Sequence, residues 1–220
     1  MEIIKYSNIG CREINQDCLA SLSFDHDKSI HIVADGIGGY DCGEIASKIV
    51  CESYIHGLVN NLSIDEVTKE VSRNIQTECR NLGVSKMGST VAAVVLNGLQ
   101  ASIFWAGDSR VYVFRDKHLL YQTEDHSLLN ELSRVRELTF DEKKRYKHII
   151  TRSIMGNADD KVDHDNFELC FGDEILICTD GMYNEYPIDY LIESIRMDKL
   201  DIEKKNDSFT DNHSFIYILL

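Results

Sequence analysis

The dipeptide Asn97-Gly98 lies between two apolar runs, "STVAAVVL" and "LQASIFWAG". An Asn-Gly pair between such runs is the strongest short-range signal for a β-hairpin, because both residues adopt the positive φ angles of a tight turn at little cost. A second pair of runs, "RVYVF" and "HLLYQT", follows across another short turn. The sequence therefore predicts antiparallel strands in series, paired with their neighbours along the chain.

Helical segments flank these strands. Apolar residues recur at helical spacing over 43–62, and Ser63 and Glu66 have the spacing of a capping box that begins a second helix. A mixed helical segment is expected over roughly 127–147, and another helix from about residue 187.

Three further strands are expected, at 29–35, at "DEILICTDG" and at "SFIYILL". Runs of strands and runs of helices, without strict alternation, indicate an α+β fold with helices packed on the sheet faces. A single proline and the absence of repeats leave no obvious linker. Residues 1–220 are therefore interpreted as one domain.

Five aspartates lie where a predicted strand ends or turns into another: Asp17, Asp35, Asp108, Asp180 and Asp211. An isolated Asp-Gly pair is usually only a turn, but carboxylates gathered at one end of a sheet repel one another and require cations. Ligand sets made only of oxygen select Mg²⁺ or Mn²⁺. The glycines after Asp35 would let a main-chain carbonyl join such a set and would leave room for a phosphoryl group.

The composition excludes several classes of protein. A net charge of −14, from 37 acidic and 23 basic residues, argues against nucleic-acid binding. Seven scattered cysteines without a Cys-x-x-Cys pair indicate neither a disulfide framework nor a thiolate zinc site. The N-terminus does not resemble a secretory leader, and the longest apolar run, "VAAVVL", is too short to cross a bilayer. A cytoplasmic protein without membrane association is expected.

Seven short motifs occur in a fixed order: "R-x-x-N-Q-D", "DGIGG", "MGST", "GDSR", "TEDHS", "CTDGM" and "DN" before the last strand. Together they resemble the metal-dependent protein phosphatase family, the type 2C (PPM) serine/threonine phosphatases, in its compact bacterial form. The resemblance extends from Arg12 to the C-terminus. It implies a four-layer αββα sandwich of two antiparallel β-sheets flanked by paired helices, with a two-metal centre at one edge.

The resemblance also implies which residues bind the two metal ions. Asp35 would bridge both ions, and the carbonyl of Gly36 would bind one of them. Asp180 and Asp211 would bind the other. The implied cofactors are two tightly bound Mn²⁺ or Mg²⁺ ions, which activate a bridging water for attack on a phosphate ester.

Three more roles follow from the same resemblance. Asp17 would act through a coordinated water, and Asp108 would help to hold a third, weaker ion. Arg12 would bind the substrate phosphate through a two-pronged hydrogen bond. The expected catalytic residues are thus Arg12, Asp35 and Asp180.

The chain departs from the family pattern near the site. Ile37 stands where many eukaryotic relatives have a histidine proposed as general acid, so no general acid is assigned. Residues 127–158 correspond to a flap beside the active site, and "TRSIMGN" carries one more residue before Gly156 than is usual. The stretch 133–152 is locally basic, which fits either a solvated helix pair or a surface that attracts phosphoproteins.

The sequence offers no candidate residues for two other kinds of phosphate chemistry, a nucleotide-binding loop and a cysteine nucleophile. "GVSKMGST" has Ser89 where a phosphate-binding loop needs lysine, so Ser89 and Thr90 are expected to open the central hairpin instead. No cysteine is followed six positions later by arginine, which excludes the cysteine-phosphatase mechanism. His126 is expected to be a hydrogen-bonded structural histidine.

The leading hypothesis is a metal-dependent phosphoserine/phosphothreonine protein phosphatase that opposes a cytoplasmic serine/threonine kinase and acts as a monomer on phosphorylated proteins. One alternative is a catalytically silent binding or regulatory module of the same fold. Another is a metal-dependent hydrolase of a non-protein phosphoester, such as a nucleotide.

Overall fold

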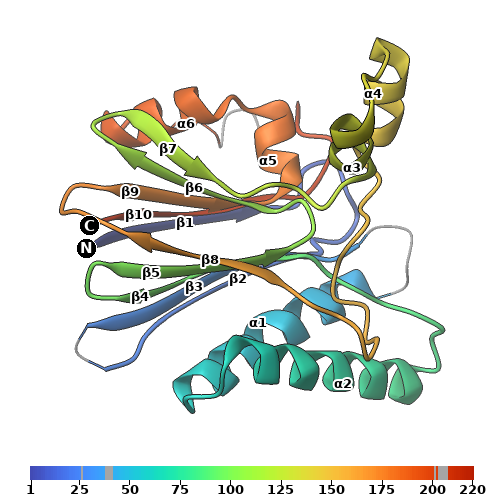
Figure 1. Cartoon of the computed structure of the whole chain (residues 1–220). Coiled ribbons are helices and arrows are strands. Elements are labelled where there is room, and N and C mark those ends of the chain that lie inside the picture. The colour runs from blue at the N-terminus through green and yellow to red at the C-terminus, as the bar shows by residue number, and fades with distance from the viewer. Residues whose placement is uncertain (26, 38–41, 201, 203–207) are drawn as a thin grey trace.

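The computed structural model describes residues 1–25, 27–37, 42–200, 202 and 208–220. Within them the strands form two five-stranded antiparallel sheets that pack face to face (Figure 1). The first sheet has the order β2-β3-β4-β5-β8, with bounds Asp17–Ser23, Lys28–Asp35, Val91–Asn97, Gln100–Ala106 and Asp163–Glu168. The second has the order β1-β10-β9-β6-β7, with bounds Glu2–Asn8, His213–Leu219, Glu174–Cys178, Arg110–Arg115 and His118–Gln122.

Helices cover the outer face of each sheet (Figure 1). The pair on the first sheet is α1 (Gly43–Val59) and α2 (Ile64–Leu82), and the pair on the second is α5 (Asp180–Glu185) and α6 (Ile188–Arg196). This arrangement confirms the α+β class and the αββα sandwich. None of the helices in the described ranges combines the length and apolar character that a membrane crossing requires.

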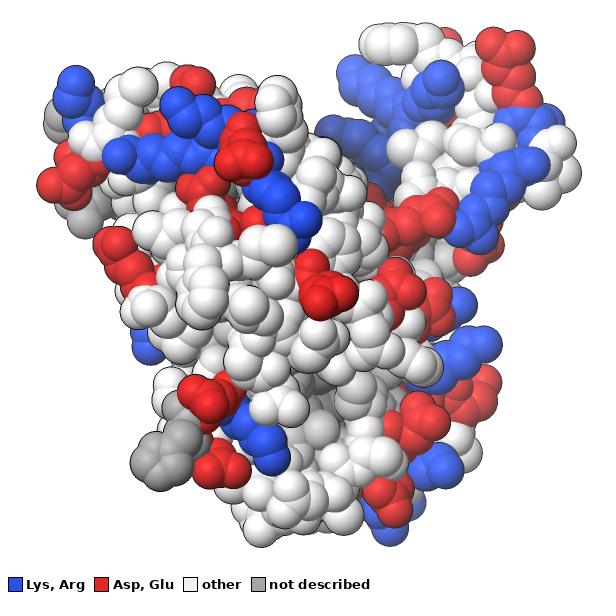
Figure 2. Space-filling view, turned by 60° about the vertical axis from the view of Figure 1, so that its left-hand side comes forward, with Lys and Arg blue, Asp and Glu red and all other residues white. Residues whose placement is uncertain are grey.

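The remaining two helices, α3 (Leu128–Val135) and α4 (Phe140–Tyr146), project from one end of the sandwich (Figure 1). They confirm the expected helical segment near 127–147. After α4 the chain runs along that end of the sandwich toward the layer of α1 and α2 before it enters β8. Lys and Arg side chains, with acidic ones among them, gather on the projecting pair (Figure 2).

Strand β3 shows why the layers form. Successive side chains of a strand point to opposite faces, and both faces of β3 are buried: one is apolar, whereas Val33 shares the other with Ser29 and His31. Ile32 packs into the cluster under α1 and α2, whereas Val33 packs between the sheets. A third cluster, with Leu176 and Phe215, lies under α5 and α6. Apolar side chains thus fill the space between the sheets and the space under each helix pair.

Two local signals in the sequence are confirmed. The capping box at the start of α2 is present, with the Glu66 carboxylate accepting from the Ser63 N–H at 2.9 Å. The β4–β5 hairpin closes at the predicted place, where Asn97 pairs with Gln100 and Gly98 has a φ of 58°. Both features depend only on residues close in sequence.

The four strands predicted in series are present as β4 to β7, but they are divided between the two sheets. The β4–β5 hairpin lies in the first sheet and the β6–β7 hairpin in the second, so the chain crosses between sheets at residues 107–109. Gly107 has a φ of 109° at this crossing. Strands β1, β2 and β8 were not predicted. Asp180, expected at a strand end, is the first residue of α5.

Candidate metal centre

Two of the five predicted aspartates are neighbours in the first sheet. Asp17 begins β2 and Asp35 ends β3, and the antiparallel register pairs them directly. The backbone of Asp35 is also held from β4: its N–H donates to Thr90 Oγ1 at 2.9 Å, and its carbonyl accepts from the Thr90 N–H at 2.8 Å. The Ser89 hydroxyl donates to the same carbonyl at 2.9 Å. Hydrogen bonds therefore fix this strand end from both sides.

The second sheet brings two more aspartates to the same edge. Asp180 directly follows Thr179 at the end of β9, and Asp211 lies just before β10. The Thr179 hydroxyl donates to Oδ2 of Asp17 at 3.0 Å, between residues 162 positions apart in the chain. The Thr179 N–H donates to the Ser214 carbonyl at 3.0 Å. These contacts join the two sheets beside the aspartates.

The fifth aspartate, Asp108, occupies the crossing between β5 and β6 and is 4% exposed. The Tyr183 hydroxyl donates to its carbonyl at 2.9 Å. The Arg110 guanidinium lies over the Tyr183 ring, 3.6 Å from its centroid, and is paired with Asp125 at 2.7 Å. Side chains from β6 and α5 thereby hold the crossing in place.

A cavity of about 430 Å³ lies where these segments meet. The predicted site residues that line it are Arg12, Asp35, Gly36, Asp108, Asp180 and Asp211. Asp17 is not among the lining residues and contacts Thr179 instead. His148 and Ile150, from the segment after α4, complete one wall.

Burial raises the pKa of four carboxyl groups at this site. Burial raises the pKa of Asp17 and of Asp108 to about 7. It also raises the pKa of Asp35 and of Asp180, and the neighbouring aspartates raise both further. Oδ1 of Asp17 and Oδ1 of Asp108 are buried and have no hydrogen-bond partner within the described ranges. Ionised carboxylates in such a place are costly unless a cation neutralises them, and a donor set made of oxygen fits Mg²⁺ or Mn²⁺.

Among the residues that the structure describes, no three His, Cys, Asp or Glu side chains already form a compact ligand set. The carboxylates that line the cavity therefore do not meet at a single point. One of them, Asp211, instead accepts a hydrogen bond from Arg12 at 2.8 Å.

Arg12 stands at the rim of the cavity. Its side chain is 55% exposed and that of Asp211 is 39% exposed. The Asn212 side chain holds the loop that carries Arg12: it accepts from the Gln16 N–H at 2.8 Å and donates to the Ile9 carbonyl at 2.8 Å. The guanidinium is thus presented to the cavity by a loop that is fixed to the start of β10.

Gly36 allows the end of β3 to approach the start of α1 closely. A Cβ atom at Gly36 would lie 2.3 Å from the carbonyl oxygen of Gly43. The Gly36 N–H donates to the Gln16 carbonyl at 3.0 Å. Only a residue without a side chain fits at this place, as the sequence suggested.

The structure adds residues that the sequence did not single out. Thr179 and Asn212 hold the site together through contacts with segments far away in the chain, and His148 lines the cavity. His126 is structural as expected, because its Nδ1 accepts from the Gly107 N–H at 3.1 Å and its Nε2 contacts Asp163 at 3.0 Å. Thr90 directly precedes β4, as predicted.

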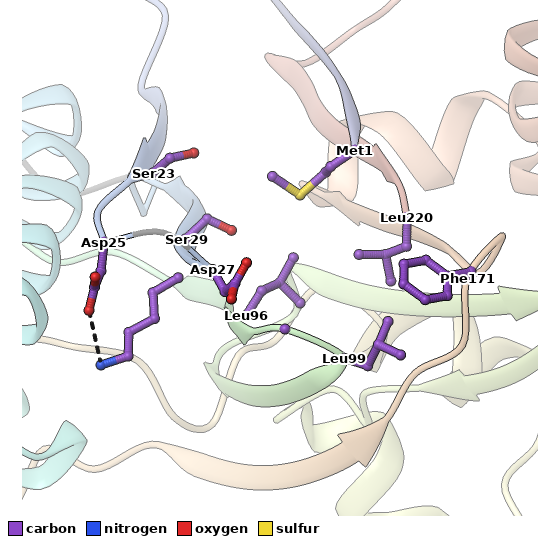
Figure 3. Close-up of a pocket in the computed structure, with 11 residues that line it drawn as sticks. Met1, Ser23, Asp25, Asp27, Ser29, Leu96, Leu99, Phe171 and Leu220 are labelled. Atoms are coloured by element: carbon purple, nitrogen blue, oxygen red, sulfur yellow. Dashed lines mark ion pairs between the residues drawn. The ribbon is translucent and has the colours of Figure 1, made fainter.

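A second cavity, of about 370 Å³, lies at the opposite end of the sheets (Figure 3). Leu96, Leu99, Phe171 and Leu220 point into it, and Asp25 forms an ion pair with Lys28 at its edge. None of the predicted site residues lines it. It offers no group of buried carboxylates, so the first cavity remains the candidate site.

Comparison with known proteins agrees with this geometry. The model of the protein phosphatase 2C family matches residues 6–209. A protein of Streptococcus pyogenes named for the 2C type of protein phosphatase is 32% identical over 96% of this chain and 90% of its own length. The protein phosphatase PhpP of Streptococcus pneumoniae is 30% identical over 84% of this chain and 80% of its own.

Solved structures show the same fold. The serine/threonine phosphatase of S. agalactiae superposes with a TM-score of 0.79 at 27% identity, covering 100% of this chain and 99% of the other. Stp1 of Staphylococcus aureus gives a TM-score of 0.82 at 22% identity, over 100% of this chain and 94% of its own. On these grounds, the chain belongs to the protein phosphatase 2C family of metal-dependent protein phosphatases.

Proposed function

We propose that this chain hydrolyses phosphoserine and phosphothreonine in proteins, with two divalent metal ions bound among Asp35, Gly36, Asp180 and Asp211. The observation that carries the proposal is the cavity lined by buried carboxylates with an arginine at its rim. The catalytic domain of PstP, a fold relative at 22% identity, has been solved with two manganese ions. That protein supports manganese as the metal to test first.

Each side chain has a defined task in this proposal. When two divalent ions are bound, the Asp35 carboxylate would be shared by both, the Gly36 carbonyl would hold one, and Asp180 and Asp211 would hold the other. When bound, such ions neutralise the carboxylates and lower the pKa of a water molecule, so that hydroxide is available for attack on phosphorus at neutral pH.

Asp17 pairs with Asp35 across the sheet and accepts a hydrogen bond from Thr179, and it would act on the metal site through a coordinated water. We assign Asp108 to a third, weaker ion, because it lines the same cavity from the crossing between the sheets.

Arg12 binds the phosphate of the substrate. Two N–H groups of a guanidinium match two phosphate oxygens, and the contact persists while the phosphoryl group transfers. To make this contact Arg12 has to release or share Asp211, which then faces the metal site. The side chain at position 37 is an isoleucine, which has no proton to donate, so it cannot protonate the leaving serine or threonine, and no general acid is assigned.

We further propose that residues 1–220 act as one monomeric catalytic domain in the cytoplasm, with 127–158 as its flap, opposing a serine/threonine kinase. The seven cysteines support the compartment, since none of them forms a disulfide within the part of the chain that the structure describes.

The test is a phosphate-release assay on metal-stripped protein, with Mn²⁺, Mg²⁺ or chelator added. We expect hydrolysis of p-nitrophenyl phosphate and of phosphothreonine and phosphoserine peptides only with a divalent metal. The variant Asp180→Asn should lose several orders of magnitude in turnover. The matched control is Asp189→Asn, which removes an exposed carboxylate in the first turn of α6 and should keep full activity.

Three results would overturn the proposal. Full activity in excess chelator would exclude the metal mechanism. Binding of phosphoproteins without hydrolysis of any phosphoester would indicate a silent module. Faster hydrolysis of nucleotides than of peptides would indicate a hydrolase of small phosphoesters.

A further inference from the structure

A groove of about 660 Å³ continues from the metal cavity. The two share Ile37, His148 and Ile150 as lining residues, so a chain that enters one can extend into the other. The groove lies on the side where the segment after α4 passes toward α2 (Figure 1). A substrate whose phosphate lies in the metal cavity would therefore place its neighbouring residues here.

The wall of the groove is fixed by backbone hydrogen bonds. Ser89 and Ile154 form an antiparallel bridge, in which the Ser89 N–H donates to the Ile154 carbonyl at 3.0 Å and the reverse bond measures 2.9 Å. The same Ser89 is bridged to Gly36. The groove is thus built on the residues that position the metal site, and its walls keep their place relative to the phosphate.

Most charges in the groove already have partners. Arg152 forms an ion pair with Asp163. One carboxylate oxygen of Asp160 accepts hydrogen bonds from the N–H groups of Met155, at 3.0 Å, and Gly156, at 2.8 Å. It also accepts from the N–H of Asn157 and from the hydroxyl of Ser72. These charges hold the wall of the groove and are not available to a ligand.

Two cations remain. Lys86 comes from the loop between α2 and β4, and Lys161 from the segment that leads into β8. Both are exposed, and neither takes part in an ion pair or hydrogen bond among the described residues. The chain has a net charge of −14, and yet two lysines without an ion pair in its described part line the same groove. One exposed acid, Asp159, lines the groove as well.

We infer that this groove selects phosphoprotein segments that carry a second anionic group within a few residues of the phosphorylated one, through Lys86 and Lys161. The inference rests on the proposed phosphatase function and adds its substrate class. The second group is a carboxylate or another phosphate, since an ammonium ion binds either as a point charge. Neither lysine belongs to the basic stretch 133–152, so this selection is separate from any attraction by the projecting helices.

The experiment compares three phosphothreonine peptides that differ only in the flanking residues: glutamines, glutamates, or glutamines with one phosphoserine in the form of its phosphonate analogue, which cannot be hydrolysed. Each exposed ion pair contributes about two-fold to five-fold, so two lysines predict a preference of roughly 4-fold to 25-fold in kcat/KM over the neutral peptide. The double variant Lys86→Gln/Lys161→Gln should reduce this preference to below two-fold. It should leave the hydrolysis of p-nitrophenyl phosphate unchanged, because that substrate does not reach the groove.

The control variant is Lys117→Gln, which removes an equally exposed lysine in the β6–β7 turn at the far end of the sandwich and should keep the preference. Raising the salt concentration should weaken the preference of the wild type. Equal kcat/KM for all three peptides, or a preference that survives in the double variant, would overturn the inference. If no peptide and no p-nitrophenyl phosphate is hydrolysed with Mn²⁺, the proposed function itself fails. A preference for the phosphoserine peptide alone would assign the groove to a second phosphate, and a preference for both would assign it to any anion.

Discussion

The substitution Gly36→Ala tests whether the close approach of β3 to α1 is required for the fold. The added Cβ would lie 2.3 Å from the Gly43 carbonyl oxygen and 2.4 Å from the carbonyl carbon, where ordinary contacts are longer than 3.4 Å. These are backbone atoms, which no change of rotamer can move away. Inserting a methyl group into packed structure costs about 1–3 kcal/mol, and we expect the upper end of this range.

For a chain of this size, about 3 kcal/mol lowers the Tm by roughly 6–12 °C. The assay is thermal unfolding followed by circular dichroism in chelator, with Gly43→Ala as the matched control. A Cβ at Gly43 would meet first the side-chain amide of Gln16, at 2.7 Å, and this side chain can rotate. Alanine at that position also favours the helix that begins there, so the control should lose less than about 1 kcal/mol. Equal shifts in the two variants, or a shift below about 2 °C for Gly36→Ala, would refute this argument.

Three further predictions concern single side chains. Arg12→Ala should raise KM with a smaller fall in kcat, reducing kcat/KM by roughly 10-fold to 150-fold, as for a charged hydrogen bond of about 1.5–3 kcal/mol. Arg12→Lys should recover part of this loss. Unchanged steady-state kinetics of Arg12→Ala on a phosphothreonine peptide would contradict the assignment. Asp108→Ala should raise the Mn²⁺ concentration that activity requires, while calorimetry still detects the two tight metal sites. Loss of the tight sites would contradict the assignment of Asp108 to the third, weaker ion. His31 is fully buried between Ser21 and Ser29, and burial lowers its pKa from 6.5 to about 4. Because the unfolded chain binds this proton first, stability should fall by up to about 3 kcal/mol as the pH drops from 6.5 to 4, and urea unfolding of His31→Gln should lack this component.

The parts of the fold that the sequence predicted are those specified by nearby residues. The turn at Asn97-Gly98 and the cap at Ser63 each depend on a few consecutive positions. Strand β8 was missed because its residues, "DHDNFE", are nearly all exposed at the edge of a sheet and show no apolar alternation. The division of the two hairpins between two sheets was missed as well, since apolar periodicity indicates burial but not which sheet supplies the partner.

The residues of the candidate site, too, were predicted only in part from the sequence. Aspartates at strand ends can be identified from the sequence, because a carboxylate directly after an apolar run is uncommon and indicates a possible functional site. Their hydrogen-bonding partners cannot be identified in this way. Nothing in the sequence distinguishes Thr179 from other threonines, and only the fold shows its hydroxyl 3.0 Å from Asp17, 162 positions away. Asn212 likewise acts on a loop near the other end of the chain. Such residues can be identified only once the two sheets are in place.

The sheet order also constrains how these 220 residues reach the folded state. Among the described strands, β1 is synthesised before the others and is paired with β10, which is synthesised after them, and β10 also separates β1 from β9. A growing chain therefore keeps β1 without its neighbour until synthesis of this region is nearly finished, and pairing over such a separation is intrinsically slow. Asp211 and Asn212 arrive with that same final strand. A chain in which β10 is not yet paired thus lacks the Asp211 wall of the metal cavity and the Asn212 hydrogen bonds that hold the loop of Arg12.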